Sequence, residues 1–215
     1  MISRSVSASV VGPTALDRAI SVIGRSRSVR AGTVIFSQGD PAVLLYALKE
    51  GAVRSYRINE GGRRQVADFH FDGDLFALED CPGHMFSAEA ISACTLIEIR
   101  RSALDALAST DLAVSEALRA ASLARMRDLQ AHVARMGHRS AIERVAAFLS
   151  DFAARTSRET IDLMVTRQDI ADYLGLSLET VSRMISHLQA ERVISLTSYR
   201  RMRICDRQAL LALSA

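Results

Sequence analysis

Short apolar runs separated by turn residues fill the chain between Arg30 and Arg100. Runs such as GTVIFSQGD, LLYALKEGAVRSYRI, RQVADFHFDGD and SACTLIEIRR are broken by Gly, Asp, Asn and Pro. In INEGGRR, Gly61 and Gly62 are both expected to supply the positive φ of a hairpin turn. Several short strands at regular spacing predict an antiparallel sandwich or barrel. The segment TALDRAISVIG, which precedes them, predicts a short helix.

A helical period replaces the strand pattern from Asp111 onward. A narrow stripe recurs at three- and four-residue steps, formed by Leu118, Ser122, Met126, Leu129, Val133 and Met136. Arginines crowd the other faces, and the helix is expected to end at Gly137. A narrow stripe on a long helix is typical of a coiled-coil seam and predicts a homodimer interface. Packing against the chain's own barrel is the alternative.

The remaining segments predict a second, helix-rich domain that starts near Gly137. SAIERVAAFLSDFAAR predicts a helix, TIDLMV a strand and ISLTSYRRMRICD a closing hairpin. Two shorter helices each have an expected N-cap. Thr166, three residues before Asp169, caps the helix of TRQDIADYLG, and Ser177 caps the helix of SLETVSRMISHLQAERVI.

The two shorter helices have the spacing of a helix-turn-helix. Gly175 can adopt the left-handed conformation that stops the first helix, and Ala171 is small where the helices cross. The shared apolar contact is expected from Ile170, Leu174, Val181 and Ile185.

The outer face of the second helix carries three polar groups that suit the major groove. Arg183 can fork onto guanine O6 and N7, Glu179 can accept from the cytosine N4 amino group, and Ser182 lies between them. A local Glu179–Arg183 salt bridge on a solvated helix is the alternative. Contacts to the DNA backbone are expected from Arg167, Gln168, Ser177, Thr180, Arg201 and Arg203, whereas alternation turns Arg200 to the other face of the hairpin.

Composition narrows the function classes. The formal net charge of +3 permits a polyanionic partner, and Lys49 is the sole lysine beside many arginines. No apolar run is long enough for a membrane helix and the Ser-rich N-terminus has no sustained apolar block, so a cytoplasmic protein is expected. No paired carboxylates, nucleophile–base arrangement or glycine-rich phosphate loop stands out, so no enzyme is expected.

The segment TRQDIADYLGLSLETVSR resembles the DNA-binding signature of the CRP/FNR transcription regulators. The resemblance implies an α+β fold with three parts. Residues 1–110 would form a jelly-roll (double-stranded β-helix) domain like those that bind cyclic nucleotides, residues 111–137 a dimerisation helix, and residues 138–215 a winged helix-turn-helix. RNA polymerase is the further partner that this resemblance implies.

The pattern formed by Glu179, Ser182 and Arg183 resembles the FNR and FixK branch of this family. That branch reads TTGAT-type half-sites, so a TTGAT–N4–ATCAA-like palindrome is expected. Members that bind cyclic nucleotides carry an Arg-Ser pair where this chain has Phe86 and Ser87, and a Glu where it has Asp74. The resemblance therefore implies no response to cyclic AMP.

The cysteines argue against an iron–sulfur cluster. FNR holds its cluster with four thiolates, whereas this chain has no cysteine before Cys81, and the barrel ligand position falls on Ile97. The combination is most similar to cluster-free FixK proteins, which control microaerobic respiration, denitrification and nitrogen fixation, so no cofactor or metal is expected. A ligand-, haem- or redox-gated effector is the alternative. Cys205, near Arg203 and Arg207, is the redox candidate, and a plain packed cysteine is the competing interpretation.

Overall fold

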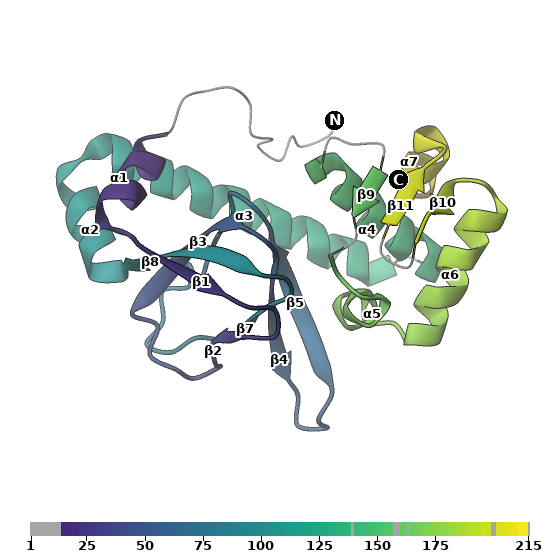
Figure 1. Ribbon diagram of the computed structural model, residues 1–215, viewed down its shortest axis with the longest axis horizontal. Helices are drawn as coiled ribbons and strands as arrows, with labels where there is room; N and C mark the ends of the chain where they lie inside the picture. Colours follow the sequence, from purple (N-terminus) through teal and green to yellow (C-terminus); the bar gives the residue numbers. More distant parts are fainter. Residues whose placement is uncertain (1–13, 139, 157–159, 163, 199–200, 215) are drawn as a thin grey trace. The chain divides into compact units, whose positions relative to one another are not determined.

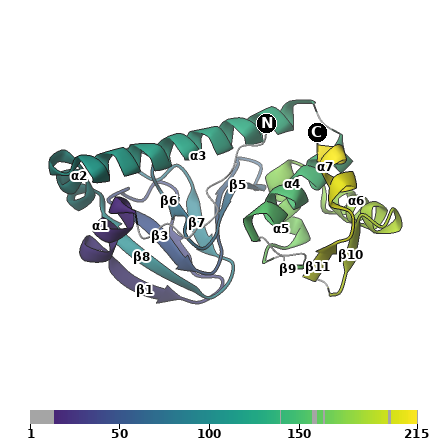
Figure 2. The same cartoon turned by 90° about the horizontal axis from the view of Figure 1, so that it is seen from above.

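The computed structural model describes residues 14–138, 140–156, 160–162, 164–198 and 201–214. The chain forms two compact units, Met1–Asp128 and Leu129–Ala215. Their division falls inside α3 (Leu112–His138), one continuous helix that contributes to both units (Figure 2). The three-part division at residues 110 and 137 stays a prediction.

The first unit is built from two four-stranded antiparallel sheets (Figure 1). One has the order β1-β8-β3-β6 and the other β2-β7-β4-β5. The strands are β1 (Arg25–Val29), β2 (Val34–Phe36), β3 (Leu44–Glu50), β4 (Val53–Ile58), β5 (Arg64–His70), β6 (Leu75–Phe76), β7 (Ser87–Ala90) and β8 (Cys94–Arg100). This architecture confirms the predicted α+β fold with a β-rich first domain.

Two apolar clusters hold this unit together. The first lies in the barrel and includes Phe36, Leu48, Phe76 and Leu96. In the second, α1 (Ala15–Ile23), α2 (Arg101–Thr110) and the first turns of α3 cover side chains of β3 and β8. Burying a large apolar side chain contributes about 1.5–3 kcal/mol, so the second cluster holds the first turns of α3 against the barrel.

The predicted seam on α3 divides into two parts. Leu118 packs, partly buried, against the second cluster, as the alternative interpretation expected. Farther along, Ser122 is exposed, and the large apolar side chains of Met126, Leu129 and Val133 are 55%, 46% and 70% exposed. The side chain of Met136 lies outside the described part of the chain. The exposed stripe is available for self-association, which remains a prediction.

The second unit combines a small antiparallel sheet with helices that pack beside it. It contains α4 (Ala141–Thr156), β9 (Thr160–Asp162), α5 (Arg167–Leu174), α6 (Leu178–Ala190), β10 (Ile194–Leu196), β11 (Arg201–Ile204) and α7 (Arg207–Ser214). The sheet order is β10-β11-β9. The hairpin predicted for the last segment is confirmed by the pairing of Ile194 with Ile204 and of Leu196 with Met202. None of the described helices is long and apolar enough to cross a membrane.

The structure corrects several local predictions. α2 and α7 were not expected: α2 has no side-chain N-cap, and α7 spans only eight residues. α3 continues one residue past Gly137. In the β4–β5 turn, Gly62 has φ of 73°, but Gly61 is not among the residues with positive φ. One left-handed residue is sufficient for this turn, because Asn59 accepts from the backbone of both Gly62 and Arg63.

Candidate DNA-binding surface

α5 begins with the predicted reciprocal cap. The Asp169 carboxylate accepts from the Thr166 backbone N–H at 3.0 Å and from the Thr166 hydroxyl at 2.7 Å. The Asp169 backbone N–H donates back to the Thr166 hydroxyl at 3.1 Å. Asp169 is 0% exposed. The first turn of α5 is therefore fixed in the interior of the unit.

The turn between α5 and α6 depends on one glycine. Gly175 has φ 63° and ψ 37°, in the left-handed region, and its N–H donates to the Ala171 carbonyl. A side chain there would carry a Cβ too close to the next carbonyl. Beyond the turn, the predicted shared contact is confirmed as buried: Ile170, Ala171, Leu174, Val181 and Ile185 are each 5% exposed or less.

The opposite face of α6 leaves the three predicted base-reading residues accessible. Glu179 and Arg183 are exposed and Ser182 is half-buried. Nη2 of Arg183 donates to the Thr180 hydroxyl at 3.4 Å. Among the ion pairs of the described residues, none joins Glu179 to Arg183, so the local salt bridge of the alternative interpretation does not form. Both charged groups remain available to a partner.

The N-terminus of α6 gathers hydrogen-bond donors and one carboxylate. The Ser177 hydroxyl caps the helix by accepting from the Thr180 N–H at 3.1 Å. The pKa of Glu179 is lowered from its ordinary value because its own backbone N–H and the Ser177 hydroxyl donate to the carboxylate, with the Arg183 charge adding to the effect. Glu179 is therefore ionised at neutral pH and can accept hydrogen bonds from a base.

The residues predicted to contact the DNA backbone lie on three elements. Arg167 and Gln168 start α5, where Gln168 donates to Asp172 at 2.6 Å. Arg201 and Arg203 are exposed on β11, and Met202 between them is 1% exposed, which confirms the alternation. Arg200 lies outside the described residues.

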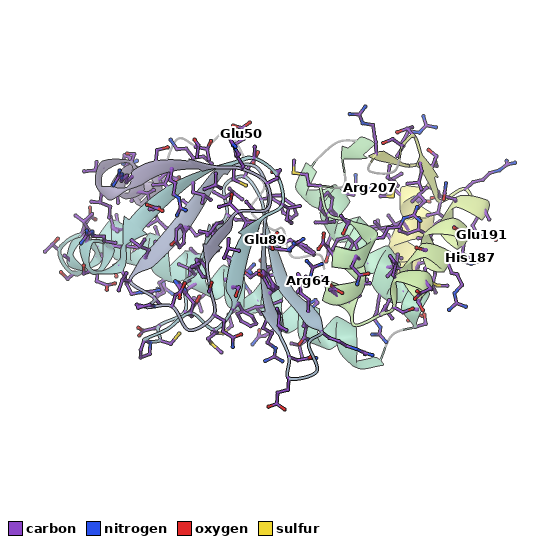
Figure 3. All side chains as sticks on the ribbon, turned by 60° about the horizontal axis from the view of Figure 1, so that its bottom comes forward. Glu50, Arg64, Glu89, His187, Glu191 and Arg207 are labelled. Atoms are coloured by element: carbon purple, nitrogen blue, oxygen red, sulfur yellow. The ribbon has the colours of Figure 1, made fainter. Side chains whose placement is uncertain are left out.

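Two residues on this surface were not singled out from the sequence. Leu178, the first residue of α6, is 39% exposed although it is apolar. Ser186 is exposed one turn beyond Arg183, on the face that carries Glu179. The i+7 spacing from Glu179 could have identified Ser186. His187 and Glu191 mark the C-terminal end of the helix in Figure 3.

In the first unit, the side chains at the cyclic-nucleotide positions bind the chain's own backbone. The Ser87 hydroxyl accepts from the Gln38 N–H at 2.9 Å, and the Asp74 carboxylate accepts from the Phe71 N–H at 2.8 Å. Phe86, in place of an arginine, is half-buried. Ile97 and Cys94 are buried, and Cys94 donates to the Ala52 carbonyl.

The chain is similar to two domain families that together span most of its length. Residues 143–213 match the Crp-like helix-turn-helix domain and residues 26–111 match the cyclic nucleotide-binding domain. In helix-turn-helix domains the second helix of the pair enters the major groove. In this chain α6 is the second helix of the pair.

Full-length relatives extend the similarity beyond the separate domains. The nitrogen fixation regulation protein FixK of Azorhizobium caulinodans is 37% identical over 91% of this chain and 82% of that protein. FixK of Rhizobium meliloti is 39% identical over 86% of this chain and 84% of that protein. The solved structure of FixK2 from Bradyrhizobium japonicum matches with a TM-score of 0.86 and 36% identity, over 90% of this chain and 98% of that one. The chain therefore belongs to the CRP/FNR family of transcription regulators and is similar to its FixK members.

Proposed function

We propose that this protein is a cytoplasmic homodimer that binds a TTGAT–N4–ATCAA-like palindrome through α6. Arg183 would fork onto the guanine, Glu179 would accept from a cytosine amino group, and Ser182 would meet a base edge between them. The observation that carries this proposal is the outer face of α6, where Glu179 and Arg183 are exposed without pairing to each other.

Affinity would come largely from phosphate contacts around this face. Ser177, Thr180 and the N-terminus of α6 suit one phosphate, because backbone N–H groups and the helix dipole favour anions there. Arg201 and Arg203 would contact the backbone from the wing, and Arg167 and Gln168 from the start of α5. Binding should therefore weaken steeply as the salt concentration rises.

The dimer would form through α3. Ser122, Met126, Leu129, Val133 and Met136 would pair with the same residues of a second copy, together with the half-buried Leu118. Pairing along this helix would present two α6 helices to successive major grooves, roughly 34 Å apart. The bound dimer would act mainly as an activator that recruits RNA polymerase, at genes of microaerobic or anaerobic respiration or of nitrogen fixation, as the similarity to FixK proteins suggests.

Gel shifts on the palindrome test this proposal. Wild-type protein should bind the palindrome, and changing its G·C pairs should weaken binding by about 1–3 kcal/mol per half-site contact. Arg183→Ala should lose the part of this difference that comes from the guanine, and the double variant Glu179→Ala/Arg183→Ala should bind both duplexes equally. Equal affinity of the wild-type protein for the two duplexes would discredit the assignment of Arg183 and Glu179.

A redox-gated form of the same function is supported by one observation. Cys205 is an exposed free thiol directly after β11, which carries Arg201 and Arg203. Oxidation there would add a polar group beside the predicted phosphate contacts. Peroxide should then weaken operator binding by the wild-type protein and leave Cys205→Ser unaffected; equal binding by both after peroxide would reject this form.

A further inference from the structure

The interior of the barrel is filled by a row of stacked rings from the chain itself. The row runs from His84 over Phe36, Tyr46 and Phe76 to His70. Successive ring centroids are 3.7, 5.4, 5.2 and 4.7 Å apart. All five side chains belong to residues that are 8% exposed or less. The row joins side chains from separate strands and loops into one packed body.

The row ends at a cluster of polar side chains on β4 and β5. Nε2 of His70 lies 2.8 Å from the Ser55 hydroxyl, and Nδ1 of His70 lies 3.9 Å from Oδ2 of Asp68. Oδ1 of Asp68 accepts from the Phe69 N–H at 2.8 Å. The Asp68 side chain is 14% exposed. This carboxylate is thus held in position by β5 and by the packed rings behind it.

The same carboxylate pairs with α3. The Arg125 guanidinium forms an ion pair with Oδ2 of Asp68, and the Arg125 side chain is 23% exposed. Arg125 lies on the face of α3 that packs on the first unit, one turn after Ala121. It directly precedes Met126, which is exposed on the predicted seam. This ion pair between two partly buried side chains attracts α3 to one particular point on β5, which apolar packing alone does not specify.

We propose that Asp68 is a positioning residue for DNA binding. Through Arg125 it holds α3 on the packed barrel in the rotation that exposes the seam. The protein's own carboxylate does this continuously, so α3 needs no small molecule to hold it in the dimerising arrangement. The inference rests on the proposed function, since it assumes that pairing of α3 enables operator binding.

The test compares two neutralised carboxylates in the full-length protein. Asp68→Asn should weaken both self-association, measured by sedimentation, and operator affinity, measured by fluorescence anisotropy, by about tenfold, the order expected for losing one partly buried ion pair. Glu89→Gln is the matched control. Glu89 (Figure 3) pairs with Arg54 at 2.8 Å between β7 and β4, with side-chain exposures of 19% and 14%. It should lower thermal stability and leave both equilibria within about twofold of wild type.

Arg125→Gln provides a second route, because its side chain is partly exposed and its removal leaves the barrel's rings in place. It should show the same tenfold loss, and the double variant Asp68→Asn/Arg125→Gln should lose no more than either single variant. Additive losses, or wild-type equilibria in both single variants, would overturn the inference. If wild-type protein does not bind the palindrome, the proposed operator is wrong, and sedimentation alone still decides whether Asp68 positions α3.

Discussion

The reciprocal cap at the start of α5 allows a sharp prediction for Asp169→Ala. Two hydrogen bonds from Thr166 to a fully buried carboxylate would be lost. A hydrogen bond to a charged group contributes about 1.5–3 kcal/mol, and the freed Thr166 groups recover part of this by binding water. The expected cost to α5 is therefore about 3 kcal/mol, or roughly 150-fold in an opening equilibrium.

Asp17→Ala is the matched control for this prediction. Asp17 and Thr14 cap α1 with the same three bonds, at 2.9, 2.7 and 3.1 Å, but on the surface. Loss of an exposed cap costs about 1 kcal/mol, or roughly fivefold. Native-state hydrogen exchange of the α5 and α1 amides measures the two openings separately. Equal acceleration of amide exchange in both helices would refute the reasoning that burial of the carboxylate, and not capping geometry, makes the loss larger for α5.

Three further predictions address the turn, the helix N-terminus and the seam. Gly175→Ala should destabilise the second unit by about 1 kcal/mol in urea unfolding because of its left-handed φ, whereas Gly61→Ala, at a glycine without positive φ, should change the first unit by less than about 0.5 kcal/mol; similar costs would contradict this. Ser177→Ala should raise the pKa of Glu179 toward its ordinary value in an NMR titration, because a hydrogen-bond donor to the carboxylate is lost. The Glu179 carboxylate should then take up its proton at a higher pH than in the wild type, and an unchanged pKa would be contrary evidence. Val133→Asp, at a 70% exposed position, should leave the fold intact but weaken self-association in sedimentation by more than tenfold, because a dimer would then hold two like charges in the seam. An unaltered dimer would show that α3 does not form the interface.

Local chemistry explains why the helix-turn-helix was predictable. Thr166 with Asp169, Gly175 and Ser177 each act within three or four residues of the bond or dihedral that they fix. Such signals survive in the sequence because they need no tertiary partner. The same argument explains why α2 was missed, since it begins without a side-chain cap at Arg100.

Other features depend on partners that are distant in sequence. Nothing near Asp68 in the sequence indicates that Arg125 will meet it, because the two residues are far apart in the chain and only the tertiary fold brings them together. The partner of Arg183 was also misjudged in the alternative interpretation, because Glu179 and Thr180 are both within reach on the helix and side-chain rotamers decide between them. The exposed stripe on α3 could be predicted, but the packing of Leu118 on the barrel could not be separated from it by period alone.

The most direct measurement of the central claim, that Arg183 reads a guanine in the major groove, uses 7-deazaguanine in the palindrome. This base keeps its pairing and loses only the N7 acceptor to which a guanidinium can donate. For the wild-type protein the substitution should weaken binding by about 1 kcal/mol or more, which raises the dissociation constant about fivefold or more, in fluorescence anisotropy at fixed salt. For Arg183→Ala, which lacks the donor, the two duplexes should bind equally. An equal loss for both proteins, or no loss for the wild type, would contradict the account.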